Sequence, residues 1–215
     1  EIEQTLALDT APITWPIGRG KTFSGTYHLA LNAVRKGDDE KERTPVNGPD
    51  SNRVAGLLPD LRFDLIDDHG RQVNERTFQG EAVAVYFGYA GCGDACPLTL
   101  ARLVTAVRAM GPEAARVRLL FVTVQPRMDQ PAVLASYLSA YDCRYLIGLT
   151  GTDSDLRALA HRLRAAWPVM SGNPPVHGTA LYVFAPRGHA VSMVTNDGGV
   201  NDVAAALTIA LDDAP

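Results

Sequence analysis

The sequence lacks long hydrophobic runs, has few cysteines and carries little net charge. None of its apolar segments approaches the roughly 18 residues that a membrane-spanning helix needs, and no signal peptide is recognisable. Its three cysteines in 215 residues exclude a small scaffold held together by disulfides. A formal net charge of −4 gives no basis for binding nucleic acid. No internal repeat or low-complexity tract points to a solenoid or an array.

The composition, with 46% hydrophobic and 20% charged residues, suits a globular domain with a sizeable core. Residues 1–52 differ from the rest, because prolines and glycines surround the charged run Arg35–Arg43. They are predicted to form an N-terminal extension and linker, with one strand within Thr22–Val34. Residues 53–215 are predicted to form the folded domain. Because the chain begins at Glu1 and not at Met, we expect a trimmed or processed form, and an anchor is one segment that trimming removes.

Two cysteines follow the most apolar segment of the predicted domain. Val83–Phe87 is a run of valine, alanine and aromatic residues, typical of a buried strand. Glycines end the run, Cys92 and Cys96 come next, and Pro97 introduces a helical pattern. The cysteines are therefore predicted to lie where a buried strand passes into a helix, the edge at which open α/β sheets bind ligands.

The spacing of Cys92 and Cys96 leaves three kinds of chemistry open. Pro97 favours the first helical position, so Cys96 is expected at or just before the helix start and Cys92 in the loop, and the strand-to-helix segment as a whole is expected to face solvent. Amides at a helix N-terminus favour a thiolate over a thiol there. Two adjacent thiolates hold a soft metal, close into a disulfide or attack one. A purely stabilising disulfide is the least favoured interpretation, because a chain with a full core needs little stapling.

The remaining periodicity predicts an alternation of strands and helices. Strands are predicted at residues 61–66, 117–124, 145–151, 181–186 and 190–195, and helices at 98–110, 131–141, after a cap at Asp153 or Ser154, and at 201–211. Cys143 is expected to be a small buried residue. His69 and His161 are interpreted as ordinary surface or core histidines and not as metal ligands.

Several motifs resemble the Sco/SenC family. Phe87–Pro97, FGYAGCGDACP, is similar to the family signature F-G-Y-T-x-C-P-x-x-C-P. Gln125–Pro131 resembles the family turn D-P-x-x-D-x-P, with Gln125 in place of its first Asp and Asp129 retained. His177–Gly188 matches the family segment D-H-[ST]-x-x-x-Y-L-I-x-P-x-G in spacing, although Val176 replaces its Asp and Gly178 its Ser or Thr. The resemblance runs from about residue 57 to the C-terminus.

The resemblance implies an α/β, thioredoxin-like fold with a central mixed sheet flanked by helices, which agrees with the predicted order β-β-α-β-α-β-α-β-β-α. In the family two cysteines and this histidine bind copper, so Cys92, Cys96 and His177 are the implied ligands of Cu(I), Cu(II) or both. The CxxxC spacing, one residue wider than the redox CxxC, leaves room for a metal ion. Met170 is a better candidate for a further donor than His189, which is expected to be exposed.

The implied function is that of a copper metallochaperone for a respiratory cytochrome c oxidase. Its partner is then the oxidase copper-site subunit or another copper protein. The chain is expected to be a monomer, periplasmic or anchored to the inner membrane facing the periplasm, without nucleic-acid partners. The alternative is a thiol–disulfide oxidoreductase in which Cys92 and Cys96 are catalytic, reducing cysteines of a copper-site partner. A peroxidase is disfavoured, because the Arg and Ser or Thr that this chemistry needs are not evident near Cys92. We also expect the Met170–His177 loop to be disordered or displaced in the metal-free protein.

Overall fold

The chain consists of two compact units, Glu1–Val46 and Asn47–Pro215. The structure, a computed structural model, describes residues 58–93, 95–165, 167, 180–194 and 198–213, and in the first unit the backbone of four strands. Among these described residues, no helix is both long and apolar enough to cross a membrane.

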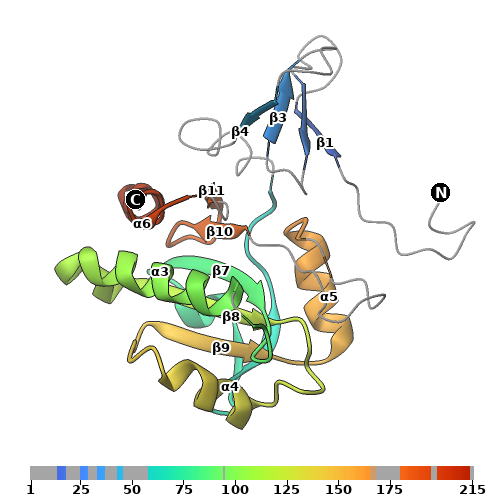
Figure 1. Cartoon of the computed structure of the whole chain (residues 1–215), viewed down its shortest axis with the longest axis vertical. Helices are drawn as coiled ribbons and strands as arrows, with labels where there is room; N and C mark the ends of the chain where they lie inside the picture. Colours follow the sequence, from blue (N-terminus) through green and yellow to red (C-terminus); the bar gives the residue numbers. More distant parts are fainter. Residues whose placement is uncertain are drawn as a thin grey trace, which may run out of the picture. The chain divides into compact units, whose positions relative to one another are not determined.

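The four described strands of the first unit form an antiparallel sheet in the order β1-β2-β3-β4. They are β1 (Thr14–Ile17), β2 (Gly25–His28), β3 (Ala33–Lys36) and β4 (Arg43–Pro45), coloured blue in Figure 1. The predicted strand within Thr22–Val34 is confirmed by β2, but the start of β3 lies there as well and pairs antiparallel with β2. Apolar alternation has the same period in both strands, so it does not reveal where the chain reverses.

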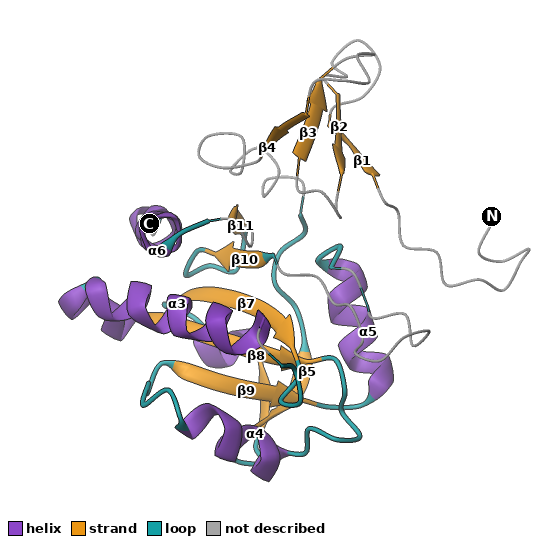
Figure 2. Cartoon of the chain, viewed as in Figure 1, coloured by secondary structure: helices purple, strands orange, loops and turns teal. Residues whose placement is uncertain are grey.

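The second unit is built on a mixed sheet of seven strands, in the order β11-β10-β7-β8-β9-β5-β6. The strands are β5 (Asp64–Asp67), β6 (Gln72–Asn74), β7 (Ala82–Gly88), β8 (Val117–Thr123), β9 (Leu146–Thr150), β10 (Leu181–Phe184) and β11 (Ala190–Val194). The helices are α3 (Ala95–Ala109), α4 (Pro131–Ser139), α5 (Asp153–Arg162) and α6 (Val200–Asp212), with 3₁₀ turns η2 (Glu75–Phe78) and η3 (Gly111–Arg116). The mixed thioredoxin-like sheet with flanking helices confirms the predicted fold class (Figures 1 and 2).

Strand β7 lies inside the sheet, and all seven of its residues are buried. It pairs in parallel with β8 and antiparallel with β10. Ala82, Ala84 and Tyr86 join one core cluster with buried residues of α3, α4 and α6. A strand buried on both faces has no need of polar alternation, which is why Val83–Phe87 reads as an unbroken apolar run.

The element order differs from the predicted one at its start. A second short strand, β6, pairs antiparallel with β5, so the unit opens with three strands before the first α-helix. Strand β5 begins at Asp64 and not at residue 61, because the Leu61 N–H donates to the Gly188 carbonyl at 2.7 Å. The N-cap of α5 is Thr152, whose hydroxyl accepts from the Asp155 N–H at 3.1 Å. Asp153 and Ser154 are thus inside the helix.

A buried carboxylate closes the turn between β5 and β6. Asp67 is 1% exposed and accepts the N–H groups of His69 at 3.0 Å and Arg71 at 2.8 Å. Its second oxygen accepts from the Arg71 Nε at 2.8 Å. Burial disfavours the charged carboxylate, but the hydrogen bonds from Arg71 and His69 outweigh it and hold the pKa of Asp67 below its usual range.

We expect Asp67→Ala to lower the free energy of unfolding by about 2 kcal/mol at pH 7, because it leaves the donors of the turn unpaired. The folded pKa lies below the unfolded one, so the ionic part of this stabilisation is present above about pH 4 and is lost as the pH falls through the folded pKa. Urea unfolding at pH 7 and pH 3 measures both. The matched control is Asp153→Ala, an exposed carboxylate paired with Arg157, expected to cost at most about 0.5 kcal/mol. An equal loss for Asp67→Ala at both pH values would contradict the ionic part.

Candidate metal centre

Cys92 and Cys96 lie beyond the carboxyl end of β7, as predicted. Cys92 is in the loop that follows Gly88, and Cys96 is the second residue of α3, directly before Pro97. The two cysteines are not joined by a disulfide. Their side chains hydrogen-bond to each other, so the two sulfurs that are four residues apart in the sequence are neighbours in space.

The two thiols differ in their surroundings. Cys92 is partly exposed, whereas Cys96 is fully buried. The expectation that this strand-to-helix segment faces solvent therefore holds for Cys92 and is wrong for Cys96. A Cβ atom built on Gly88 would lie 2.9 Å from the Cys96 Sγ. The end of β7 thus leaves room for this sulfur only because residue 88 has no side chain.

Burial raises the pKa of the Cys96 thiol to about 12, and the hydrogen bond with Cys92 adds to the shift. A hydrogen bond from the backbone of Tyr89 acts in the opposite direction but is smaller. The expectation that the start of α3 favours a thiolate at Cys96 is therefore wrong. Removing the charged sulfur from water costs more than the amides at the helix N-terminus return.

The side chains of two buried tyrosines each hydrogen-bond with one of the two cysteines. The Tyr86 hydroxyl donates to the Cys96 Sγ at 3.7 Å, and the Tyr89 side chain hydrogen-bonds with Cys92. Burial raises the pKa of both phenols, and the nearby thiols raise it further, so both tyrosines stay protonated at neutral pH. Neither tyrosine is assigned a role by the sequence patterns, although both belong to the Tyr-Phe-Gly-Tyr segment that ends β7.

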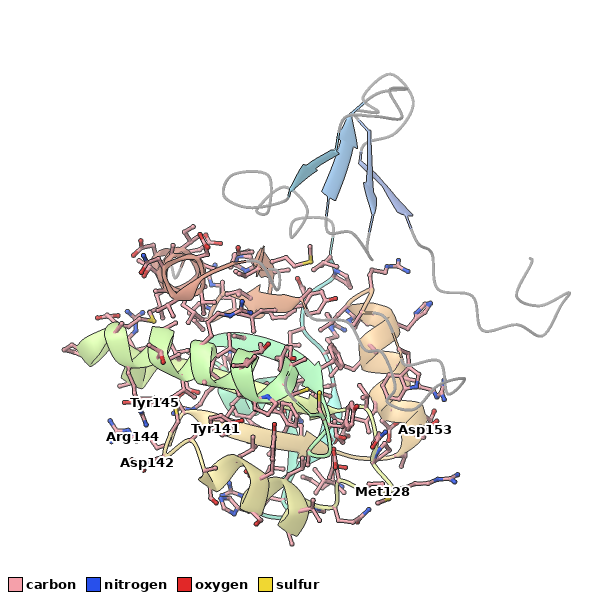
Figure 3. The ribbon with its side chains drawn as sticks, in the orientation of Figure 1. Met128, Tyr141, Asp142, Arg144, Tyr145 and Asp153 are labelled. Atoms are coloured by element: carbon pink, nitrogen blue, oxygen red, sulfur yellow. The ribbon has the colours of Figure 1, made fainter. Side chains whose placement is uncertain are left out.

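The loop between β8 and α4 is hydrogen-bonded to the cysteine loop. Asp129, between β8 and α4, is 2% exposed, and its Oδ2 accepts the N–H of Ala90 at 3.0 Å and the Thr123 hydroxyl at 2.6 Å. Its neighbour Met128 is 71% exposed and extends away from the sheet (Figure 3). The turn is closed by the Gln125 carbonyl, which accepts the N–H groups of Met128 and Asp129. These are backbone bonds, so the replacement of the family Asp by Gln125 leaves the turn intact.

His177 and Met170 lie outside the described residues, as do Val176, Gly178 and the loop expected to be displaced. Among the residues that the structure does describe, no group of three or more His, Cys, Asp or Glu side chains is arranged to hold a metal ion. His69 and His161 are exposed, and His189 is paired with Asp213.

Cys143 is partly buried and packs against the core cluster that includes Leu134 and Leu138. It lies on the loop between α4 and β9, whereas Cys92 and Cys96 follow β7. Its expected role as a small core residue thus holds in part, because some of its surface remains exposed.

The sequence model of the SCO1/SenC family matches the chain over residues 58–212. The chain belongs to the SCO1/SenC family. That range begins at residue 58, the first described residue of the second unit, and it contains the whole seven-stranded sheet. The four-stranded sheet of the first unit lies outside it.

Individual relatives agree with the family assignment. The mitochondrial SCO2 homolog of Bos taurus is 34% identical over 183 residues, which are 82% of this chain and 65% of that protein. Bradyrhizobium japonicum ScoI, solved with copper bound, is 29% identical with a TM-score of 0.61, covering 71% of this chain and 99% of that one. Yeast Sco1, also solved with copper bound, is 25% identical with a TM-score of 0.65, covering 73% and 91%. The chain spans 54% to 65% of the length of three curated SCO1/SenC relatives.

The described part of this SCO1/SenC site supplies two sulfur donors in unlike environments. Thiolates select soft metal ions, and the buried, aromatic surroundings of Cys96 restrict water at one of the two sulfurs. The same pair is also suited to thiol–disulfide exchange, because an exposed thiol stands next to a second thiol that can resolve a mixed disulfide.

Proposed function

We propose that this protein binds copper through Cys92, Cys96 and His177 and acts in the assembly of the copper site of a respiratory cytochrome c oxidase. The observation that carries the proposal is the pair of mutually hydrogen-bonded thiols beyond the end of β7, in a chain of the SCO1/SenC family. The copper bound to Bradyrhizobium japonicum ScoI and yeast Sco1 supports the choice of metal. The proposed partner is the copper-site subunit of the oxidase or another copper protein. This protein would bind its partner as a monomer, on the periplasmic side of a bacterial inner membrane.

The donor set fits copper. Two thiolates and one imidazole favour soft or borderline ions, and Cu(I) accepts three ligands, whereas zinc prefers a fourth. Binding needs both sulfurs deprotonated, so the metal has to displace the proton of Cys96, whose pKa burial raises to about 12. In the described residues, Tyr86 and Tyr89 remain available as hydrogen-bond donors to the two sulfurs after those protons leave.

The second candidate function is thiol–disulfide exchange, favoured by the unequal exposure of the two thiols. The Cys92 thiolate would attack a partner disulfide, forming a mixed disulfide and releasing one partner thiolate. The Cys96 thiolate would then attack the Cys92 sulfur, forming the Cys92–Cys96 disulfide and releasing the second partner thiolate, which takes up a proton. The partner is reduced by two electrons and the cysteine pair is oxidised by two.

His177→Ala separates the two functions, because only copper binding needs the imidazole. We expect the affinity for Cu(I), measured by competition with a chromophoric chelator, to fall by at least about a hundredfold, since even changes outside the ligand sphere cost 10–100-fold. The rate of disulfide exchange with glutathione should stay within twofold of the wild type. His161→Ala, a change of an exposed histidine on α5, is the matched control and should leave both measurements unchanged. Unaltered copper affinity in His177→Ala would remove the histidine from the proposed ligand set.

A further inference from the structure

The buried carboxylate of Asp129 joins the ends of two parallel neighbouring strands. Its Oδ2 accepts the Ala90 N–H at 3.0 Å, from the loop after β7, and the Thr123 hydroxyl at 2.6 Å, from the last residue of β8. Asp129 is 2% exposed and Thr123 is fully buried. Hydrogen bonds to an ionised carboxylate are about twice as strong as those between neutral groups. A single side chain thus provides a strong connection between the loop after β7 and the end of β8.

The loop that carries Asp129 is itself fixed. The Thr123 hydroxyl accepts the Gln125 N–H at 2.9 Å, and the Asp129 N–H donates to the Gln125 carbonyl at 2.9 Å. The Val124 N–H donates to the Gly88 carbonyl at 2.8 Å, which extends the pairing of β7 and β8. The carboxylate therefore projects toward the cysteine loop from a turn that is closed by its own hydrogen bonds.

The residue that Asp129 holds is followed by Gly91 and Cys92 and preceded by Tyr89. The Tyr89 carbonyl accepts the Cys92 N–H at 3.1 Å, and the Tyr89 backbone hydrogen-bonds to the Cys96 sulfur. Tyr89 thus contacts both cysteines through its main chain. Ala90, between Tyr89 and the rest of this turn, is the point at which Asp129 fixes the turn to the sheet.

We propose that Asp129 is a positioning residue for the cysteine pair: through the Ala90 N–H it holds the Tyr89–Cys92 turn so that the Tyr89 main chain keeps its hydrogen bonds with both cysteines in the dithiol form. The inference deepens the proposed function, since it concerns the same two sulfurs, but its test uses the metal-free protein. If Asp129 contributed only to folding, its loss would reduce stability without changing the chemistry of the pair. If it positions the pair, the balance between dithiol and disulfide changes as well.

The experiment compares Asp129→Ala with Asp67→Ala in a Cys143→Ser background, so that Cys92 and Cys96 are the only cysteines that exchange with glutathione. Each variant removes a buried carboxylate that accepts at least one backbone N–H of a turn, but Asp67 lies between β5 and β6. Equilibration with glutathione disulfide and glutathione measures the exchange constant, in which one glutathione disulfide oxidises the pair and yields two glutathione thiols. Loosening the turn weakens the hydrogen bond that Tyr89 gives to Cys96 in the reduced form. We expect Asp129→Ala to shift the constant about tenfold toward the disulfide, equivalent to about 30 mV.

Asp67→Ala should leave the exchange constant within twofold of the background protein. Asp129→Asn should recover most of the wild-type value, because one amide oxygen can accept both hydrogen bonds. If Asp129→Ala does not fold, Thr123→Val provides the same comparison, since it removes one of the two donors that orient the carboxylate, and a shift of at least threefold toward the disulfide is expected. A constant within twofold of the background in the folded variant, or a shift toward the dithiol, would overturn the proposal. None of these outcomes depends on copper binding, which the His177→Ala comparison tests separately.

Discussion

Gly88→Ala is expected to destabilise the protein by about 3 kcal/mol, at the upper end of the usual cost of overpacking a core, and to disrupt the cysteine pair. A Cβ atom at this position would lie 2.6 Å and 3.0 Å from two ring carbons of Phe121 and 2.9 Å from the Cys96 Sγ. Phe121 is fully buried and packs against the rings of Tyr86 and Tyr137, so its ring has no free space to enter. The sulfur or the backbone of β7 has to move.

Denaturant unfolding measures the loss of stability, and the glutathione exchange constant measures the displacement of the pair. Gly93→Ala is the matched control, because Gly93 is an exposed glycine between the two cysteines, where an added Cβ atom would meet nothing within 4 Å. It should change the free energy of unfolding by no more than about 0.5 kcal/mol. A Gly88→Ala variant as stable as Gly93→Ala would mean that β7 and Cys96 do not approach each other as closely as described.

Cys92 is expected to react with iodoacetamide at least about a hundredfold faster than Cys96 in the reduced, metal-free protein at pH 7. The thiolate is the reacting species. Raising the pKa of the Cys96 thiol from 9.0 to about 12 lowers its thiolate fraction about a thousandfold at neutral pH. Full burial of the sulfur slows the reaction further. Peptide mapping by mass spectrometry in the Cys143→Ser background assigns each rate to its residue.

The pH dependence provides a second check on this asymmetry. The Cys96 rate should keep rising about tenfold per pH unit through pH 10, because the pH remains below its raised pKa. Cys92→Ser should leave Cys96 slow, since burial and not the neighbouring thiol is the larger cause of the shift. In guanidinium chloride the two cysteines should react at similar rates. Equal rates in the folded protein would contradict the described burial of Cys96.

The sequence by itself determined the elements that carry the site. The apolar run Val83–Phe87 and the residue Pro97 predict the strand and the helix start between which Cys92 and Cys96 lie, and β7 and α3 occur there. Such local patterns suffice because strand burial and the constraints of proline act on neighbouring residues. The motif spacing likewise indicated the family over nearly the range that matches it.

Only the tertiary structure decided what surrounds the two thiols. The depth of Cys96 depends on the approach of Gly88 and Phe121, from two adjacent strands, and that depth reverses the direction of the pKa shift expected from the helix start alone. The hydrogen bond between Ala90 and Asp129 joins residues 39 positions apart. Such contacts arise from strand order and side-chain packing, which a period or a motif does not encode, because they bring together segments whose patterns are independent of each other.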